Sequence, residues 1–403
     1  MSNTIKKISI FGMFGAKNVG DEIISFVMNR KIKEKFPDSK IQILSQDPSY
    51  SLQFIEDKDV NVMELNLFNR KFWGQVKKNL EIIKKCDVLI VGGGGLFQDQ
   101  YSFHLPLSTL LVLAVGISNG IPSYVIGTGF GPIKSKKIKN IASRVMENVD
   151  YINLRDEKSY EYFNSICRNS NVNLTADVVP SLDEFDFYRN YWNEDSNIIS
   201  FVLRDWKGID EKGIGKLIDK LIENNYKIRF HCYEYAPDFD LVNRILSNSK
   251  NKTDINIEII NPKSTGDAYA KLVESLVVIS MRYHGCILAA TLGVPLIPVK
   301  YEIKVEELAK QLRIDNDLVE TNSLNVDMYS SIVNLESIKK HNRSKYIDNF
   351  NVIRINSNKN FNVFNDKSKN RDVTKLSRLS VISILLYGFI EYIQYFVKSR
   401  SSR

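Results

Sequence analysis

An arginine and a histidine two positions apart, Arg282 and His284, are the strongest candidates for chemistry in this chain. They follow an apolar run at residues 276–279 that predicts a buried parallel strand, and they precede a run at residues 286–290 that predicts a helix. Parallel α/β sheets bind ligands at the carboxyl ends of their strands, and helix N-termini favour anions. The spacing therefore predicts an anion site with an imidazole that exchanges protons near neutral pH. The alternative is that His284 is a histidine of the core.

A second arginine, Arg204, ends the predicted strand at residues 198–203, so both guanidinium groups are expected at one cleft. Two such groups suit a ligand that carries both carboxylate and phosphate, because each can pair with two oxygens. Either arginine could instead form a structural ion pair, for Arg204 with the adjacent Asp205. Lys304 follows the predicted strand at residues 296–299, and it is expected either to reach the same cleft or to lie exposed.

Three glycine-bearing loops follow predicted strands in the first half of the chain. Glycine lets a backbone approach a ligand closely, and the alternative is a tight turn that binds nothing. The spacing does not match the dinucleotide fingerprint GxGxxG. Since all three loops follow strands, we expect them at one edge of a sheet, with Asp21 and Asp99 as candidate general bases. The candidate ligand-binding residues in these loops are Asn18, Gly93, Gly94, Gly95 and Gly129.

Short apolar strands alternate with helices twice along the chain, which predicts two doubly wound, Rossmann-like α/β domains that face a cleft. A polar stretch without periodicity separates the two series, and a mobile linker is expected from about Ser357 to Asp372. The expected organisation is a first domain at residues 1–185, a linker at 186–197, a second domain at 198–315, a returning helical and linker segment at 316–372, and a tail at 373–403.

The tail contains an apolar segment at residues 379–397 that is interrupted by one line of polar side chains at helical spacing, with basic residues on both sides. Glu391 and Gln394 disfavour a helix that spans a bilayer. The pattern predicts an amphipathic helix that lies in a membrane interface. The alternative is a helix docked on the protein itself or on a partner subunit.

Composition sets the remaining limits. The 55 Lys and Arg residues exceed the 47 Asp and Glu residues, a net charge of +8 that favours anionic partners only mildly. No arginine-rich block or nucleic-acid motif is present, so no nucleic-acid partner is expected. The four cysteines are far apart without a CxxC pair, which disfavours a zinc site or a disulfide framework and fits a reducing cytoplasm. The N-terminus runs into a predicted strand without an apolar signal segment.

Taken together, these stretches resemble the polysaccharide pyruvyltransferase family. Two departures are visible: this chain has Asp177-Val178 where the family often has Asp-Pro, and the tail lies outside the resemblance. The matching pieces, in the order of the family, are residues 18–22, 92–97 and 127–132, Arg155-Asp156 with Ser159, Arg204, residues 280–285, and residues 293–295 with Lys304.

The resemblance implies a GT-B-like fold, with the acceptor on the N-terminal domain and the donor on the C-terminal domain. It implies transfer of a pyruvyl group from phosphoenolpyruvate to a sugar of a cell-surface polysaccharide or exopolysaccharide, usually as a cyclic ketal. By the family pattern, Arg204 and Arg282 would hold the donor's carboxylate and phosphate, His284 would be the general acid, and Lys304 would assist. No cofactor or metal is implied, and the acceptor is expected to be a sugar or a lipid-linked oligosaccharide.

Two other functions stay open at this point. One is a nucleotide-sugar glycosyltransferase with the same two-domain shape. The other is a catalytically silent, membrane-associated subunit of a polysaccharide assembly machine, which the tail favours and the intact set of Arg204, Arg282 and His284 disfavours. The expected location is the cytoplasm, at the inner face of the cell membrane if the tail binds lipid.

Overall fold

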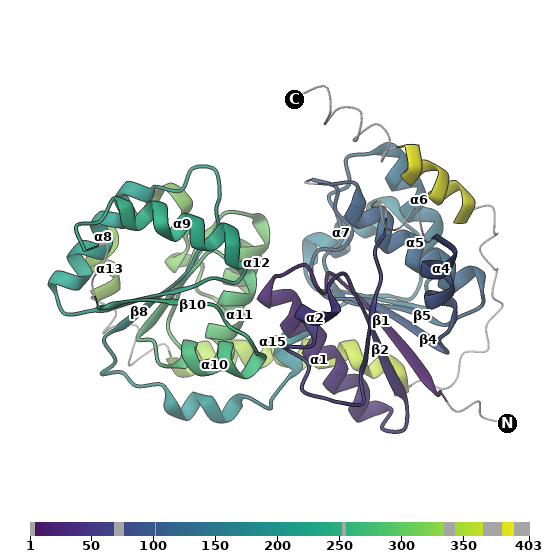
Figure 1. Cartoon of the computed structure of the whole chain (residues 1–403), viewed down its shortest axis with the longest axis horizontal. Coiled ribbons are helices and arrows are strands. Elements are labelled where there is room, and N and C mark those ends of the chain that lie inside the picture. The colour runs from purple at the N-terminus through teal and green to yellow at the C-terminus, as the bar shows by residue number, and fades with distance from the viewer. Residues whose placement is uncertain are drawn as a thin grey trace. The chain divides into compact units, whose positions relative to one another are not determined.

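The computed structural model describes residues 5–67, 76–100, 102–251, 255–333, 343–365 and 381–390. The chain forms two compact units, each built around one sheet of parallel strands (Figure 1). Unit 1 comprises residues 1–16, 24–178 and 356–403, and unit 2 comprises residues 17–23 and 179–355. The fold class predicted from the alternation of strands and helices is therefore confirmed.

The sheet of unit 1 has the strand order β3-β2-β1-β4-β5-β6-β7. Strand β4 at its centre is apolar on both faces, as expected of a parallel sheet covered by helices on both sides; its consecutive residues Leu89 and Ile90 point to opposite faces and are both fully buried. The strands are β1 Lys7–Phe11, β2 Lys40–Ser45, β3 Asn61–Glu64, β4 Val88–Gly92, β5 Ser123–Thr128, β6 Tyr151–Leu154 and β7 Val172–Leu174.

Helices cover both faces of this sheet (Figure 1). One face packs against α4, α5 and α6, and α1 lies on the other. Helix α5 is buried almost throughout, which explains its apolar sequence on all sides. The helices are α1 Val19–Lys35, α2 Pro48–Ser51, α4 Val76–Lys84, α5 His104–Ser118, α6 Lys136–Met146 and α7 Glu157–Ile166.

The sheet of unit 2 has the strand order β10-β9-β8-β11-β12-β13. Its strands are β8 Ile198–Val202, β9 Lys227–His231, β10 Ile257–Ile260, β11 Val277–Ser280, β12 Leu296–Lys300 and β13 Val319–Glu320. The α-helices are α8 Glu211–Glu223, α9 Tyr235–Ser247, α10 Thr265–Val273, α11 Tyr283–Leu292, α12 Ile303–Leu312, α13 Tyr329–Val333 and α15 Arg343–Asn362, the last of which continues into unit 1. The 3-10 turns of the chain are η1 Val179–Ser181, η2 Asp186–Tyr191, η3 Asp315–Asp317, η4 Thr321–Ser323, η5 Val326–Met328 and η6 Val363–Asn365.

In each sheet the direction of winding reverses at one place. In unit 1 this place lies between β1 and β4, and in unit 2 it lies between β8 and β11. Open parallel sheets bind ligands beyond the carboxyl ends of the strands at such a reversal. Because β1, β4 and β5 are neighbours, the three glycine loops that follow them meet at one edge of the sheet, as the sequence predicted.

The division of the chain differs from the expected one in three places. Residues 17–23 group with unit 2, although they follow the first strand of unit 1. The expected linker at residues 186–197 contains η2, which packs against α10 and α11 and so belongs to unit 2. The stretch expected to be mobile from Ser357 is helical through Asn362, because Ser357 and Asn360 are buried and hydrogen-bonded to the end of the unit 1 sheet.

Residues 381–390 of the tail form a helix docked on unit 1, shown in yellow beside α6 (Figure 1). Ile384 is buried in the unit 1 core, and Val381 and Leu385 pack against it. The remainder of the expected amphipathic segment, including Glu391 and Gln394, lies outside the described residues. No helix among the described residues is both long enough and apolar enough to cross a bilayer.

All four cysteines are buried with free thiols. Burial raises the pKa of the thiols of Cys167, Cys232 and Cys286 to about 12, and it raises the pKa of Cys86 above its ordinary value. They are packing residues of the core, as the positions of Cys86 and Cys286 beside predicted strands indicate for those two.

Candidate active site

Three neighbouring strands of unit 2 carry the candidate residues at their carboxyl ends. Arg204 follows β8, His284 follows β11 and Lys304 follows β12. Strand β11 pairs with β8 so that Ser280 lies opposite Val202, and Met281 donates a backbone hydrogen bond to the Val202 carbonyl. The chain segments that carry Arg204 and Arg282 therefore leave the sheet side by side at the reversal of winding.

Arg282 is held in place by carboxylates from α9. Its side chain is 5% exposed, and its Nη2 donates to Asp238 and, at 3.3 Å, to Glu234, while its Nε donates to the Leu203 carbonyl at 3.2 Å. Burial opposes the positive charge, but the neighbouring carboxylates outweigh it, so the pKa of the Arg282 guanidinium lies above its ordinary value. The Nη1 group has no hydrogen-bond partner among the described residues.

Arg204 has a different environment. Its neighbour in sequence, Asp205, pairs with Arg244 at 2.9 Å rather than with Arg204. The Arg204 guanidinium lies 5.7 Å from the ring centres of both Trp206 and Tyr301, and it forms no ion pair within the described part of the chain. The structural ion pair considered for Arg204 with Asp205 is therefore absent. It is Arg282 whose charge is compensated, and Arg204 is the half-buried cation without a carboxylate beside it.

Tyr301 connects these cations, and the sequence analysis missed it. Its ring packs edge-on against Trp206, with the ring centres 5.1 Å apart. The Nζ of Lys304 lies 5.0 Å from the same ring and pairs with Glu302 at 2.6 Å. A signal was present in the sequence, because Tyr301 lies two residues after the predicted strand at residues 296–299 and three residues before Lys304. Aromatic rings attract cations, and both Arg204 and Lys304 lie within 6 Å of the centre of this ring.

His284 is the second residue of α11, and the N-cap residue of this helix, Arg282, makes no capping hydrogen bond with its side chain in the described structure. Its imidazole lies against the first turn of α1, because a Cβ placed on Gly20 would fall 2.3 Å from His284 Nδ1. This turn belongs to unit 2 and is anchored there by Val19, whose amide donates to the Tyr233 carbonyl at 2.8 Å.

Asn18 and Asp21 lie in the same turn. The Asn18 side chain accepts the amide hydrogen of Gly20 at 2.9 Å and so caps α1. Asp21 follows Gly20 directly and is partly exposed. The glycine loop after β1 therefore contributes its last residues to the immediate surroundings of the histidine. The sequence predicts that the loop after the first strand and the stretch that carries His284 each lie at the end of a strand. It does not predict that the two lie next to each other.

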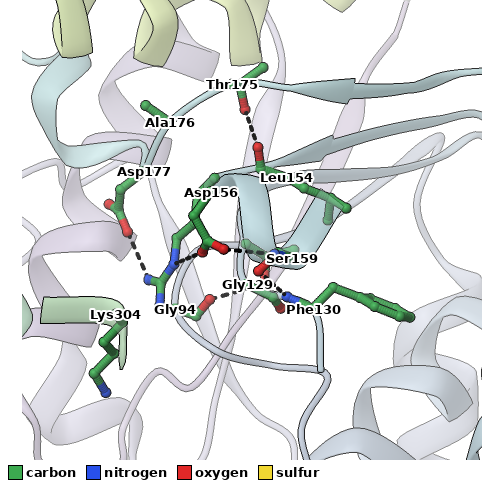
Figure 2. Close-up of polar contacts among 12 residues, drawn as sticks. Gly94, Gly129, Phe130, Leu154, Asp156, Ser159, Thr175, Ala176, Asp177 and Lys304 are labelled. Carbon is green, nitrogen blue, oxygen red and sulfur yellow. Dashed lines mark hydrogen bonds and ion pairs between the residues drawn. The ribbon is translucent and has the colours of Figure 1, made fainter. Parts of the chain in front are cut away.

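The remaining expected residues lie in unit 1, where the glycine loops after β4 and β5 are joined by a backbone hydrogen bond. The Gly129 amide donates to the Gly94 carbonyl at 2.8 Å (Figure 2). Gly93 has a positive φ of 71°, and a Cβ there would fall 2.1 Å from the Ile24 side chain, so only glycine fits. Gly95 differs: apart from its neighbours in the chain, no atom of the described residues lies within 4 Å of the position that its Cβ would take. Asp99 accepts the amides of residues 134 and 135 with its two oxygens, at 2.6 and 2.8 Å, which fixes the chain before α6.

The Arg155-Asp156 pair and Ser159 support the glycine loop after β5. Ser159 Oγ accepts the Phe130 amide at 2.9 Å, and Asp156 caps α7 by accepting the Ser159 amide at 2.8 Å (Figure 2). Arg155 is 6% exposed and pairs with Asp177 at 3.0 Å. These contacts make the motif a scaffold for the loop.

The candidate residues thus divide into two groups. Unit 1 holds Gly93, Gly94, Gly95, Asp99 and Gly129, and unit 2 holds Asn18, Asp21, Arg204, Arg282, His284 and Lys304. Within unit 2 the structure brings His284 next to the turn of Asn18 and Asp21, and it brings Arg204 and Lys304 to one aromatic ring. Among the described residues, no group of three or more His, Cys, Asp or Glu side chains could hold a metal ion.

Comparison with known proteins decides the family. The sequence model of polysaccharide pyruvyl transferase matches residues 18–303, which is most of the chain and includes the candidate residues of unit 2 up to Tyr301. The chain belongs to the polysaccharide pyruvyl transferase family. The family is one of transferases that act on polysaccharides. The amylovoran biosynthesis protein AmsJ of Erwinia amylovora is 23% identical over 347 residues, a match that covers 73% of this chain and 80% of that protein.

Solved structures share the fold at low sequence identity. UDP-GlcNAc 2-epimerase from Neisseria meningitidis, bound to UDP-GlcNAc, matches with a TM-score of 0.55 and 15% identity, covering 88% of this chain and 98% of that one. Anabaena HepE, in complex with UDP and glucose, matches with a TM-score of 0.53 and 11% identity, covering 99% of this chain and 100% of that one. This pyruvyl transferase family member therefore has the twin Rossmann-like, GT-B-like fold of sugar-nucleotide enzymes.

Proposed function

We propose that this protein transfers a pyruvyl group from phosphoenolpyruvate to a sugar of an exopolysaccharide or its lipid-linked precursor, forming a ketal. The family supplies the class of reaction, and AmsJ, named for amylovoran biosynthesis, supports an exopolysaccharide as the product. The observation that carries the donor assignment is Arg204. It is a half-buried guanidinium at the reversal of winding, with aromatic rings but no described carboxylate beside it. A small ligand with carboxylate and phosphate groups would satisfy it.

The reaction needs one proton donor and two sugar hydroxyls. Protonation of C3 of phosphoenolpyruvate by His284 makes C2 electrophilic, and a sugar oxygen forms a bond to C2 while its proton leaves to a base. The bond between C2 and the phosphate oxygen then breaks, a second hydroxyl oxygen attacks C2 and gives up its proton to the departing phosphate, and inorganic phosphate is released. Proton transfer by a positioned group contributes roughly 100- to 10,000-fold to the rate.

The donor would be held by groups from three strand ends. Arg204 and Lys304, gathered around Tyr301, would pair with its anionic groups. Arg282, fixed by Asp238 and the Leu203 carbonyl, would offer its Nη1 group. Phosphate would also be stabilised by the start of α11, where backbone amides and the helix dipole favour negative charge. Positive groups that are already held in position stabilise the negative charge on the departing phosphate. They lower the activation barrier of the reaction because they need not move as that charge develops.

For the general base we favour Asp21 over Asp99. Asp21 follows the glycine that contacts His284, whereas both oxygens of Asp99 accept backbone amides of the chain before α6. We assign the glycine loops of unit 1 to the acceptor sugar. Gly95 supports this, because the described structure leaves open the space that a side chain at this position would take. We place the activity in the cytoplasm, where phosphoenolpyruvate is made.

Phosphate release from phosphoenolpyruvate tests the proposal, measured with the full chain against a panel of nitrophenyl and lipid-linked sugars. Wild-type protein should release phosphate only with a suitable acceptor, and Arg204→Ala should raise the KM for phosphoenolpyruvate at least tenfold. Arg244→Ala is the matched control, since Arg244 lies in the same unit, its side chain is 41% exposed, and it pairs with Asp205 and Glu211.

The leading alternative, a nucleotide-sugar glycosyltransferase, is supported by the fold shared with UDP-binding structures. Thermal stabilisation by UDP-sugars, together with no stabilisation and no phosphate release with phosphoenolpyruvate, would establish it and overturn the pyruvyl assignment.

A further inference from the structure

The helix at residues 381–390 has two apolar faces, one buried in the core of unit 1 and one that is largely exposed. The inner face carries Ile384, which is 2% exposed in the core of unit 1. The opposite side carries four large apolar side chains that are 42–58% exposed, which we call the outer face: Ile382, Leu386, Phe389 and Ile390. Their spacing of four, seven and eight residues places them on one stripe of the helix.

An apolar stripe of this kind is unusual on a water-facing surface. Single exposed apolar residues are common, but a contiguous set marks a surface that meets a membrane or another protein. The helix from Val381 to Ile390 contains no charged residue to interrupt the stripe. The polar positions Ser383 and Tyr387 lie beside it, and Tyr387 is partly covered by the core and by Lys137.

Positive charge lies next to the outer face. The Nζ of Lys137, on α6, is 5.1 Å from the centre of the Tyr387 ring. Arg144 is two helical turns further along the same side of α6, and both side chains are exposed. The sequence of the tail is itself basic, since residues 373–403 contain five basic residues and one acidic residue: Lys375, Arg378, Lys398, Arg400, Arg403 and Glu391.

We propose that the outer face inserts into the interface of an anionic lipid membrane, with Lys137 and Arg144 contacting lipid headgroups. Apolar side chains beside exposed cations are the combination that binds such a surface, each charge adding to the attraction. A second copy of the chain fits less well, because a symmetric interface would bring the same cations together. The inference does not depend on the pyruvyl assignment, since lipid binding needs neither donor nor acceptor.

Flotation of the full chain with vesicles tests the proposal. We expect the protein to float with vesicles of phosphatidylglycerol and phosphatidylcholine, to float much less with phosphatidylcholine alone, and to be released by high salt. The double variant Leu386→Ser with Phe389→Ser should lower the partition coefficient between vesicles and water at least about tenfold. Each substitution removes the favourable free energy of transferring one large apolar side chain out of water. Lys137→Gln with Arg144→Gln should weaken binding to anionic vesicles specifically.

Leu52→Ser is the matched control, because Leu52 is 51% exposed elsewhere in unit 1. All these side chains are exposed, so the variants should keep the wild-type Tm, and phosphate release with a water-soluble acceptor should stay unchanged. Failure of wild-type protein to float, or equal flotation of the double variant, would overturn the proposal. A wild-type dimer that the double variant converts to monomer would assign the outer face to a second copy instead.

Discussion

The imidazole of His284 occupies space that only glycine leaves open at position 20. A Cβ on residue 20 would fall 2.3 Å from Nδ1 and 2.8 Å from Cγ of the ring, closer than atoms approach without moving. The φ of Gly20 is not in the positive region, so the requirement is for space rather than for backbone freedom. This contact couples the first turn of α1 to the proposed acid.

Replacing His284 with alanine should abolish turnover while leaving donor binding largely intact. Loss of the proton donor is expected to lower kcat by about 100- to 10,000-fold, with the KM for phosphoenolpyruvate changed less than about threefold. Steady-state phosphate release measures both constants. Equal turnover in variant and wild type would refute the acid role.

Gly20→Ala should impair the enzyme through the same ring. The added methyl group forces the imidazole or the helix turn to move, so we expect at least a tenfold loss of kcat and a loss of about 1–3 kcal/mol in the free energy of unfolding. Gly266→Ala in α10 is the matched control, because its Cβ would meet only Ser264 Oγ at 4.0 Å. Urea unfolding and phosphate release check both variants, and wild-type kcat in Gly20→Ala would contradict the coupling.

Asp238→Asn should destabilise unit 2 by leaving the buried Arg282 charge poorly compensated. The expected loss is roughly 3 kcal/mol of the free energy of unfolding, at the low end for a broken buried pair because Glu234 remains. Asp205→Asn breaks the exposed pair with Arg244 and should cost less than about 1 kcal/mol. Urea unfolding measures both losses. Similar losses of the free energy of unfolding in Asp238→Asn and Asp205→Asn would contradict the prediction that the buried pair contributes more than the exposed one.

His231 should make unit 2 sensitive to acid. The residue is 2% exposed with Nε2 3.2 Å from Ser200 Oγ, and burial, with the charges of Arg229 and Lys271, lowers its pKa from 6.5 to about 3. Between about pH 6.5 and pH 3, His231 therefore binds a proton in the unfolded chain but not in the folded chain. The free energy of unfolding falls as the pH drops through this range. The expected loss at pH 5 is about 2 kcal/mol relative to pH 8. The free energy of unfolding of His231→Gln, measured with urea, should depend less on pH than that of the wild type. The same pH dependence in both would show that His231 is not the source of the acid sensitivity.

Much of the fold could be predicted because its strands are short runs of apolar residues that precede polar or glycine-rich loops. The runs at residues 88–91 and 276–280 are fully buried strands, as their composition indicated. The edge strands β7 and β13 escaped prediction because they have only three and two residues, too few to show a pattern. The end of α15 escaped because its Ser357 and Asn360 resemble a linker until their buried hydrogen bonds are known.

The candidate site could be predicted only in part. Parallel strands fix which end of the sheet Arg204, His284 and Lys304 share, so their neighbourhood followed from the sequence pattern. Their partners did not follow. Asp238 reaches Arg282 from α9, and Gly20 meets His284 from the far end of the chain; such contacts depend on tertiary packing. Only the structure therefore shows that the charge of Arg282 is compensated by carboxylates and that Arg204 forms no ion pair within the described part of the chain.

The four buried thiols give this protein a practical property. Alkylating reagents attack the thiolate form, and at neutral pH these thiols stay protonated and out of reach. Native cysteines therefore need not be removed before site-specific labelling. A single cysteine introduced at exposed Leu386 would take a maleimide dye selectively, and the emission of an environment-sensitive dye there would report directly on its immediate surroundings.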